Sequence, residues 1–434
     1  MSITDAPRPR VYRGAARVDS AEQARTIAHA LADRFAVDAA ARDAERRLPH
    51  DEIDELSTSG LLAITVPSRF GGPDLAPSVV ADVTRILAAA DPNIAQIPHS
   101  HFVYLNLLRL AASDDLARRQ FDEVLRGGRV ANAQSEKGGQ TVADIATTLT
   151  RQAPGRFLLD GEKFYATGSL FADTLAVLAR YDAGDDDPAG FDSGEYIAFI
   201  PVDAPGVERI DDWNALGQRT TASGTVRLSG VSVDAGDLLA RAPAVSRPTG
   251  YGAFAQLLHV AIDVGIARGA LDAAVQFVRT TSRPWFEAGV DRAVDDELLV
   301  QRFGELGVEV ITAEATLEAA SRAVDRATTI DLVQEAGTEH AGTEDAGTAA
   351  QTRLVADASI AVAAAKVVAD KVCNSVGSAL FEVSGTRSAA AGSGLDRFWR
   401  NARTHTLHDP VRWKVQHVGR HVLRGECPPS HGVI

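Results

Sequence analysis

The stretch RTHTLHDP, residues 403–410, places two histidines three positions apart, with an aspartate directly after the second. The imidazole of His408 has an ordinary pKa of about 6.5, so it can donate or accept a proton at neutral pH. Together with His405, and with His99 and His101 of the segment PHSH, it could instead supply ligands to a metal ion. Either ring could also simply cap a helix or pack in a core. The stretch alone leaves these three possibilities open.

These side chains need a frame to hold them, and the chain is long enough to build one. Its 434 residues favour two to three domains with an ample core. Hydrophobic residues make up 45% and charged residues 24%, which is typical of a globular protein and argues against disorder. After a flexible N-terminus at 1–19, we expect a helical domain at 20–128, a β domain at 129–245 and a helical bundle at 246–434.

The first of these domains shows a helical period. The segments AEQARTIAHALADRFAVDAAARDAERR and PSVVADVTRILAAAD carry apolar residues at three- and four-residue spacing. Between them lies GLLAITVPSRFGGPD, where Pro67, Gly71 and Gly72 indicate a tight loop. Helices broken by short loops are therefore predicted from about residue 20 to residue 126.

The pattern changes to short strands in the middle of the chain. TLAVLAR, YIAFIPV and GTVRLSGVSV are short, rich in β-branched residues and bounded by turn residues. In RFLLDGEKFYATG, Asp160 and Gly161 separate two apolar runs, a pattern that predicts a hairpin turn. The segment 130–235 is therefore predicted to be a β domain.

The helical period returns at about residue 250 and continues. The segment QTRLVADASIAVAAAKVVADKVCNSVGSALFEV is rich in alanine, so a neighbouring helix can approach it closely. Long amphipathic helices in succession favour a four-helix bundle. Residues 336–350 contain the near-repeat AGTEH, AGTED, AGTAA and are expected to form a mobile acidic insert without chemistry. One face of a long helix is formed by Leu299, Phe303, Leu306, Val310, Ala313, Leu317 and Ala320.

Charge and cysteine content exclude several classes of function. The formal net charge of −14 argues against nucleic-acid binding, because phosphates require a basic surface. The cysteines Cys373 and Cys427 are too few for a disulfide framework, so we expect a reduced, cytoplasmic location. The N-terminal residues lack an apolar signal-peptide core, and no run of eighteen apolar residues indicates a membrane span.

Several motifs together resemble the acyl-CoA dehydrogenase superfamily. These are ANAQSEKGG (131–139), KFYATGSLFADTL (163–175) and the loop GLLAITVPSRFGGPD, in a chain with the order helices, strands, helices. Within that superfamily the chain is most similar to the flavin-dependent monooxygenases related to dibenzothiophene monooxygenase, and closest to the sulfur-acquisition oxidoreductases. The segments that carry this resemblance are DDWNALGQRTTASGTV, ARGALDAA, TTSRPW and LDRFWRNARTHTLHDPVRWK. The implied fold is α+β and mainly α.

The resemblance implies an enzyme that uses reduced FMN and dioxygen. Such an enzyme oxygenates a small organosulfur compound through a C4a-hydroperoxyflavin, receives FMNH2 from a separate flavin reductase, and assembles as a homotetramer whose subunits complete one another's cofactor sites. No G-x-G-x-x-G motif follows a strand here to bind a nicotinamide cofactor, in keeping with a separate reductase. An FAD-dependent, acyl-CoA dehydrogenase-type oxidation of a thioester is the alternative, and a metal-binding or non-enzymatic helical protein is a third.

The resemblance also implies roles for particular residues. Acyl-CoA dehydrogenases commonly carry a glutamate base near this position, whereas no glutamate lies between Arg400 and Pro410 in this chain. The histidine that matches in the monooxygenase branch lies beside the flavin, so His408 is expected to be the catalytic acid or base. Asn132 matches an amide at the reactive edge of the flavin, and Thr167 matches a hydroxyl near the flavin N5. Both residue types also favour turns, so structural roles remain open.

Further cofactor and substrate contacts are implied by the same resemblance. Arg283 and Arg387 match arginines that bind the FMN phosphate, a group that guanidinium ions bind well, although exposed arginines most often form surface ion pairs. Ser135 lies on the flavin-contacting segment, and Trp213 either stacks on the flavin or fills the seam between domains. Ser100 stands where one relative has a tyrosine, and Gln96 stands where the same relative has a histidine. With the neighbouring His101, Ser100 is expected to bind substrate in a differently shaped pocket, and no metal ion is expected.

Overall fold

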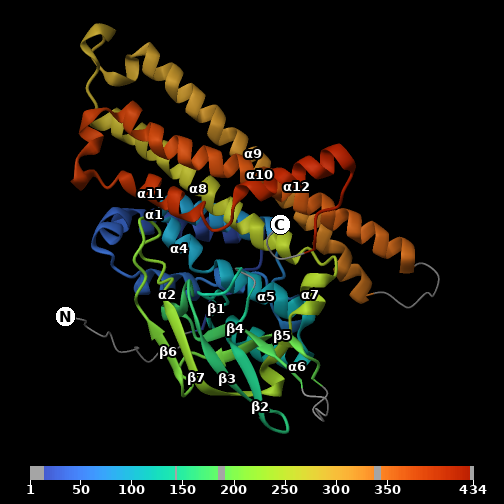
Figure 1. Cartoon of the computed structure of the whole chain (residues 1–434). Helices are drawn as coiled ribbons and strands as arrows, with labels where there is room; N and C mark the ends of the chain where they lie inside the picture. Colours follow the sequence, from blue (N-terminus) through green and yellow to red (C-terminus); the bar gives the residue numbers. More distant parts are fainter. Residues whose placement is uncertain (1–13, 142–143, 184–190, 337–343, 431–434) are drawn as a thin grey trace.

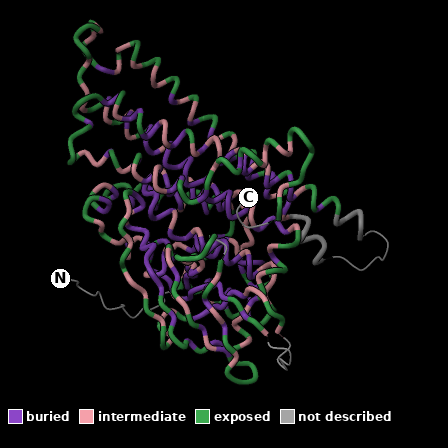
Figure 2. The backbone as a smooth tube through the Cα atoms, in the orientation of Figure 1, coloured by how far each residue is buried: buried purple, intermediate pink, exposed green. Residues whose placement is uncertain are grey.

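The computed structural model describes residues 14–141, 144–183, 191–336 and 344–430, without the side chains of 329–336 and 344–348. The chain folds into three layers (Figure 1). The C-terminal helices form one outer layer, the β domain forms the other, and the N-terminal helices lie between them. Figure 2 shows that the buried backbone runs continuously through all three layers. The α+β, mainly α fold expected from the sequence is therefore confirmed.

The N-terminal layer consists of helices whose ends carry capping residues. The Ser20 hydroxyl accepts a hydrogen bond from the backbone N–H of Gln23 at the start of α1, and Ser113 does the same for α6. Asp91 caps α4, whose first residue is Pro92, a position that proline favours. The helices are α1 (Ala21–Glu45), α2 (His50–Thr58), α3 (Pro77–Ala90), α4 (Pro92–Gln96), α5 (His99–Ala111) and α6 (Asp114–Leu125).

The β domain contains one sheet of eight strands in the order β6-β7-β3-β2-β4-β5-β8, with β1 paired in parallel to β4. TLAVLAR, YIAFIPV and GTVRLSGVSV form β4, β5 and β7, as predicted. The strands are β1 (Val130–Ala133), β2 (Thr148–Ala153), β3 (Arg156–Lys163), β4 (Thr174–Tyr181), β5 (Gly194–Pro201), β6 (Val207–Ile210), β7 (Thr225–Asp234) and β8 (Leu238–Ala240).

The hairpin turn predicted at Asp160 and Gly161 is wrong. Strand β3 runs straight through both residues, and the turn between β2 and β3 lies at 154–155, where Gly155 has a φ of 72°. The pairing of β3 with β7 shifts register between Leu159 and Gly161, so the dipeptide forms a β-bulge. A side chain at Gly161 would lie 2.3 Å from the Thr147 hydroxyl, so glycine is required there by close packing.

The C-terminal layer is built around two long alanine-rich helices, α8 (Tyr251–Thr280) and α10 (Glu344–Ser384), with α9 (Glu297–Ala336) alongside. Glycines at 265 and 269 let α8 approach α3, because a Cβ at Gly269 would lie 2.2 Å from the carbonyl oxygen of Ala89. Among the described helices α8 alone is long and apolar enough to cross a membrane, and 94% of that stretch is buried, as expected for a core helix. Shorter helices follow at α11 (Asp396–His405) and α12 (Val411–Arg424), and α7 (Ala242–Ser246) precedes α8.

The predicted helix face of α9 is confirmed, since its members from Leu306 to Ala320 are buried and the first two are partly buried. Residues 344–350 of the expected insert belong to α10, whereas 337–343 lie outside the described residues. Short 3-10 helices complete the fold at Leu61–Ala63, Ser68–Phe70, Ser169–Phe171, Ala235–Asp237, Phe286–Ala288, Ala293–Asp295, Thr386–Ala389 and Ala391–Ser393.

Candidate active site

His408 of the stretch RTHTLHDP lies in a stack of imidazole rings between α5, α8 and α11, and His405 lies beside that stack. The ring of His259, on α8, is sandwiched between His99, the first residue of α5, and His408. Its centroid lies 3.9 Å from each of the other two rings, and the interplanar angles are 30° and 35°. We call His99, His259 and His408 the histidine stack. His408 belongs to the turn after α11, so the stack joins the bundle to the N-terminal layer.

A chain of hydrogen bonds leads from the stack into the bundle. His259 Nδ1 lies 3.1 Å from Nε2 of His405, the last residue of α11. Nδ1 of His405 lies 2.6 Å from Oδ1 of Asp263, and Nζ of Lys366 lies 2.6 Å from the other oxygen of that carboxylate. The side chains of Asp263, Lys366 and His405 are fully buried. An ion pair so deeply buried is costly unless its geometry is close to ideal.

The electrostatic surroundings keep the stack neutral. Burial lowers the pKa of His99 to about 3, against an opposing hydrogen bond to the carbonyl of Ala255. Burial and the neighbouring histidines lower the pKa of His259 well below its ordinary value. Burial also lowers the pKa of His408 to about 4, with Asp409 opposing the shift. His408 is nevertheless an exposed residue, whereas His99 is partly exposed and His259 is buried, so a ligand reaches the stack most easily at His408.

The carboxylate of Asp263 stays ionised at the other end of the chain. Burial acts to raise its pKa, but the charge of Lys366 and the hydrogen bond from His405 outweigh that effect and lower the pKa to about 2. Because an ionised carboxylate can only accept, His405 must donate its Nδ1 proton to Asp263.

Asn132 and Thr167 lie in the β domain, on two segments that pass beside each other. Their chain neighbours meet, because a Cβ at Gly168 would lie 3.9 Å from the Cβ of Ala131 and 3.1 Å from the carbonyl oxygen of Ile97. Ile97 directly precedes the turn into α5, which begins at His99, so α5 connects this pair to the histidine stack. The buried Oδ1 of Asn132 has no hydrogen-bond partner. A buried polar atom in this state is expected to have a partner in the occupied site.

Thr167 is the partly exposed end of a row of hydroxyl groups. Its Oγ1 lies 2.7 Å from Oγ of Ser223, which lies 2.7 Å from Oγ1 of Thr221. The hydroxyl of Thr221 donates to the carbonyl of Gln218 at 3.0 Å. This row fixes where the Thr167 oxygen lies, and it leaves that oxygen able to donate or accept a further hydrogen bond.

Trp213 belongs to the loop that ties the β domain to α11. Its indole Nε1 donates to the carbonyl of Gln218 at 2.7 Å, and its ring meets Tyr165 edge-on at 6.0 Å. The backbone N–H of Gln218 donates to Oδ1 of Asn401 at 2.6 Å. In the same loop a Cβ at Gly217 would lie 2.0 Å from the carbonyl oxygen of Arg400. The loop therefore presses the β domain directly against the helix that ends at His405.

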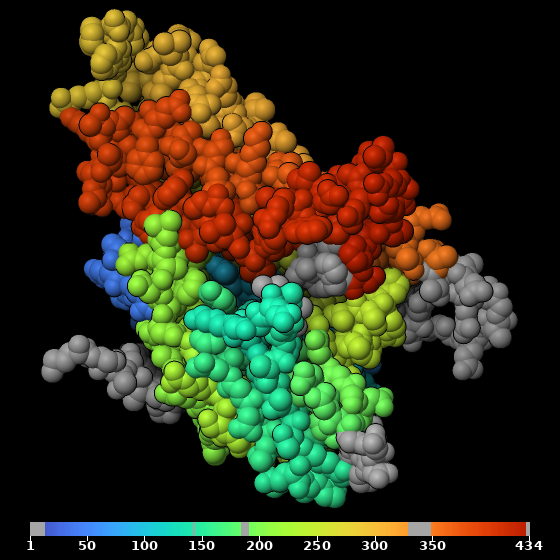
Figure 3. Space-filling view, viewed as in Figure 1, coloured from blue at the N-terminus to red at the C-terminus, as the bar shows by residue number. Residues whose placement is uncertain are grey.

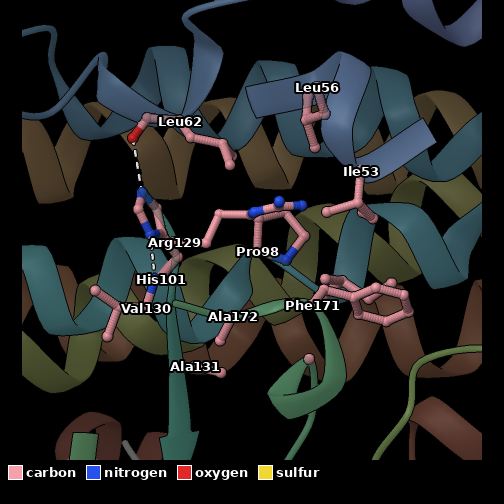
Figure 4. A pocket seen from close by; sticks show the side chains of 12 residues that line it. Ile53, Leu56, Leu62, Pro98, His101, Arg129, Val130, Ala131, Phe171 and Ala172 are labelled. Atoms are coloured by element: carbon pink, nitrogen blue, oxygen red, sulfur yellow. Dashed lines mark hydrogen bonds between the residues drawn. The ribbon is translucent and has the colours of Figure 1, made fainter. Parts of the chain in front are cut away.

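Both ring nitrogens of His101 form hydrogen bonds with the backbone, which favours a structural role, and the substrate-binding role expected from the sequence stays a prediction. Its Nδ1 accepts a hydrogen bond from the backbone N–H of Val130 at 3.1 Å, so Nε2 carries the proton and donates to the carbonyl of Leu62 at 2.8 Å. Both nitrogens are occupied, and the side chain is buried. His101 also lines a small apolar pocket beside Arg129, Val130 and Ala131 (Figure 4). Its neighbour Ser100 is likewise buried, in the first turn of α5.

The remaining predicted contacts are exposed. Ser135 pairs with Phe164 in an isolated β-bridge near the start of the β domain. Arg387 lies against the segment that carries Arg283, because Nη1 of Arg387 donates to the carbonyl of Thr281 at 2.9 Å. Thr281 follows the C-terminus of α8, whereas His259 is near its N-terminus. A rise of about 1.5 Å per residue separates His259 from that C-terminus by about 30 Å, so the arginines and the stack lie at opposite ends of the helix.

His259, Asp263 and Lys366 were not predicted as site residues. In the sequence, His259 and Asp263 interrupt the apolar run LLHVAIDVGIA four residues apart, which places them on one helix face. Two polar residues on one face of a buried helix are the signal that could have identified them. Among the described residues, no group of three or more histidine, cysteine, aspartate or glutamate side chains is arranged to hold a metal ion.

The fold and the site together define a protein of the acyl-CoA dehydrogenase type. The family model for the acyl-CoA dehydrogenase N-terminal domain matches residues 19–128, and the model for the C-terminal domain matches residues 257–413. The central sheet lies between the two matches. The C-terminal match includes the histidines of α8 and α11 together with Lys366.

Particular relatives narrow this class. Dibenzothiophene monooxygenase of Rhodococcus qingshengii is 30% identical over 410 residues, covering 93% of each chain. The probable FMNH2-dependent monooxygenase SfnC of Pseudomonas putida is 31% identical over 93% of this chain and 95% of its own. Among solved structures, FMN-bound TdsC from Paenibacillus sp. A11-2 has a TM-score of 0.83 at 32% identity, covering 95% of this chain and all of TdsC. Methanesulfinate monooxygenase MsuC from Pseudomonas fluorescens has a TM-score of 0.81 at 29% identity, covering 96% of this chain and all of MsuC.

The chain belongs to the acyl-CoA dehydrogenase family, in its flavin-dependent monooxygenase branch. The resemblance found in the sequence motifs is thereby confirmed, and the class of enzyme is an oxidoreductase.

Proposed function

We propose that this protein binds reduced FMN and uses dioxygen to oxygenate a small organosulfur compound, as part of sulfur acquisition in the cytoplasm. The observation that carries the proposal is His408, a neutral and accessible imidazole in the place where a dehydrogenase of this family needs a carboxylate base. The relatives with the same fold are named as monooxygenases of sulfur compounds, which supports the same reaction class here.

The residues present fit a flavin at this position. The Oδ1 of Asn132 has no hydrogen-bond partner, and the hydroxyl of Thr167 can form a further hydrogen bond, so both groups can receive polar atoms of a ligand. When bound, reduced FMN supplies the electrons and the site at which dioxygen is activated. The protein would supply orientation: Asn132 and Thr167 would bind polar atoms of the cofactor or of the oxygen, and His408 would donate or accept a proton. Trp213 and Ser135 border this side.

The alternative dehydrogenase reaction lacks its base. The carboxylate that follows His408 in the chain is Asp409, which is buried and forms an ion pair with Lys414 at 2.8 Å. Burial acts to raise the pKa of Asp409, but Lys414 outweighs that effect and lowers it, so this carboxylate is a poor acceptor for a proton from a thioester substrate. The site therefore supports oxygen chemistry better than removal of a proton next to a carbonyl.

The phosphate of FMN would be bound by Arg283 and Arg387 of a second copy of the chain. The two arginines lie on adjoining segments about 30 Å along α8 from the stack, and the ribityl chain of one flavin cannot span that distance. A homotetramer in which two bundles lie side by side would bring the end of one α8 to the stack of another. Exposed apolar side chains on the outer helices support such packing: Leu298, Val308 and Ile311 on α9, and Val415, Val422 and Leu423 on α12.

The proposed activity is tested with purified protein, FMN, NADH and an added flavin reductase. Sulfones, sulfonates, sulfinates and thiophenes are screened under ¹⁸O2, and products are identified by mass spectrometry. Transfer of one labelled oxygen atom, lost in His408→Ala and retained in His29→Ala, is the expected result. His29 is an exposed histidine of α1 and serves as the matched control. Tightly bound FAD, together with oxidation of a thioester without label, would instead support the dehydrogenase.

The cofactor contacts and the assembly are tested separately. Titration with FMN should show weaker binding in Arg283→Ala and Arg387→Ala than in Arg292→Ala, a control at an exposed arginine paired with Asp295 on the same connecting segment. Native mass spectrometry should show a tetramer for wild-type protein. A stable monomer that binds FMN with unchanged affinity in both test variants would refute the shared site.

A further inference from the structure

The ion pair of Lys366 and Asp263 fixes the position of every proton along the chain that leads to the histidine stack. Asp263 is an acceptor only, so His405 carries its proton on Nδ1 and presents an unprotonated Nε2. A hydrogen bond of 3.1 Å from that Nε2 to Nδ1 of His259 then requires the proton to be on His259. The neutral His259 ring is therefore protonated at Nδ1 as well, and its Nε2 is a base.

His99 is fixed in the same way from the other side of the stack. Its Nε2 lies 3.0 Å from the carbonyl oxygen of Ala255, which accepts only, so the His99 proton is on Nε2. His99 cannot move its proton to the other ring nitrogen without losing a buried hydrogen bond, and His259 can do so only if Nε2 of His405 takes up the proton. The ring of His259 is thus the one through which the stack communicates with the interior of the bundle.

We infer that Lys366, Asp263, His405 and His259 form a buried proton relay that serves the histidine stack. A proton accepted at Nε2 of His259 is matched by transfer of the Nδ1 proton of His259 to Nε2 of His405. One proton enters, one moves between the rings, and the positive charge ends on His405, 2.6 Å from the carboxylate of Asp263. The reverse sequence returns the proton to the stack. His259 and His405 are the transferring groups, and Asp263 and Lys366 are positioning residues.

The charges around the relay explain why its end point is His405. Lys366 acts against a positive charge on His99, His259 or His408, and the three rings also act against one another. Only His405 adjoins a carboxylate oxygen directly. The titratable groups that face this cluster are His99 on α5, Asp263 on α8, Lys366, Asp370 and Cys373 on α10, Arg403 on α11, and His408, Asp409 and Lys414 at and after the following turn.

The relay deepens the proposed function and rests on it for its purpose. Insertion of one atom of dioxygen into a substrate sends the other atom out as water, so the site must deliver protons to reduced oxygen. His408 is exposed and neutral, and a single imidazole next to a dry cofactor site has no reserve once it has given up a proton. A buried partner that stores one proton beside a carboxylate provides that reserve.

The relay is tested without flavin or substrate, by solid-state NMR of sedimented protein labelled with ¹⁵N-histidine. Nitrogen shifts distinguish the two neutral tautomers from the imidazolium ion, and single substitutions assign the signals of the eleven histidines. Near pH 8, His405 and His259 should be protonated at Nδ1 and His99 at Nε2. When the cluster takes up a further proton, the imidazolium signal should be that of His405, which adjoins the carboxylate of Asp263, and not that of His99, His259 or His408. A wild-type spectrum with His405 or His259 protonated at Nε2 overturns the relay.

Two variants should change the spectrum in different ways. In Asp263→Asn the amide oxygen is expected to face the ammonium of Lys366, so the NH2 group faces His405 and reverses the tautomers of His405 and His259. In Lys366→Met the carboxylate keeps both tautomers, and its unneutralised charge favours an imidazolium at His405 up to a higher pH than in wild type. A purely structural role would change the same tautomers in Asp263→Asn but would leave the pH profile of kcat/KM unchanged. Unchanged tautomers in Asp263→Asn, or an imidazolium that does not persist to higher pH in Lys366→Met, would refute the inference.

Lys163→Met is the matched control. Lys163 is also fully buried and paired with a carboxylate, Glu136, but in the β domain. This variant should lose stability and leave every signal of the stack unchanged. With a substrate from the oxygenase screen, the pH profile of kcat/KM should shift in Asp263→Asn and not in Lys163→Met. If the protein has the expected tautomers but no oxygenase activity, the proposed function is refuted and the relay is still supported.

Discussion

His101 provides a direct test of whether its ring is structural or binds substrate. Replacement by glutamine keeps an N–H donor that can reach the carbonyl of Leu62, but its amide oxygen is bonded to Cδ rather than to Cγ, so no acceptor lies at the place of Nδ1 for the backbone N–H of Val130. Leaving that buried donor unsatisfied costs about 1–3 kcal/mol of unfolding free energy. Near pH 7.5 His101→Gln should therefore be less stable than wild type by this amount.

The difference should shrink in acid. Burial lowers the pKa of His101 to about 4 in the folded protein, from 6.5 in the unfolded chain. The unfolded state therefore binds the proton more tightly, and stability falls as the pH drops below 6.5, with the loss complete below about 4. At pH 5 the wild-type protein loses about 2 kcal/mol through this residue, since each pH unit in the window contributes about 1.4 kcal/mol. The variant lacks this loss, so the two proteins should become nearly equal.

Urea denaturation at pH 7.5 and pH 5 measures both values, with His29→Gln as the control at an exposed histidine. The control should follow wild type at both pH values. Equal losses of stability in His101→Gln and wild type between the two pH values would refute the reasoning. A variant as stable as wild type at pH 7.5 that no longer bound substrate would restore the role expected from the sequence.

Two further predictions concern close packing and thiol burial. Gly217→Ala should lower the melting temperature by several degrees in a thermal scan, because its Cβ would lie 2.0 Å from the backbone oxygen of Arg400, whereas Gly194→Ala has open space and should match wild type. With a thiol reagent, Cys427 should react at once and Cys373 only after unfolding, because Cys373 is buried and burial raises the pKa of its thiol well above the ordinary value. Rapid reaction of both thiols in the folded protein would contradict the second prediction.

The order of helical and strand segments along the chain was predictable from periodicity, but the position of one turn was not. The helical spacing on α9 and the β-branched segments of β4, β5 and β7 specify their own structure, because each buries one repeating face. At Asp160 and Gly161 the local preference for a turn was overridden by close packing of Gly161 against Thr147. Gly161 and Thr147 lie on different segments of the chain, so the residues next to Asp160 and Gly161 do not predict this contact.

The candidate site was predictable only where its residues lie in recognisable motifs. His408, Asn132 and Thr167 belong to motifs shared with relatives. His259 and Lys366 lie inside long helices, where only the four-residue spacing from His259 to Asp263 indicates a polar face. Their chemistry comes from contacts across the bundle, and a single sequence does not show which faces meet. For the same reason His101 was assigned to substrate, since its backbone partners on Leu62 and Val130 are far away in the chain.

The separation of the histidine stack from Arg283 along α8 has a genetic consequence. If one copy of the chain supplies the histidines and another the arginines, each polypeptide contributes two half-sites to two different neighbours. Alleles carrying His408→Ala and Arg283→Ala, each defective alone, would then complement when co-expressed. In some mixed assemblies, a site would combine the intact histidines of one subunit with the intact arginine of another. Selection at either end of α8 would accordingly act on the chemistry carried out by a sister subunit.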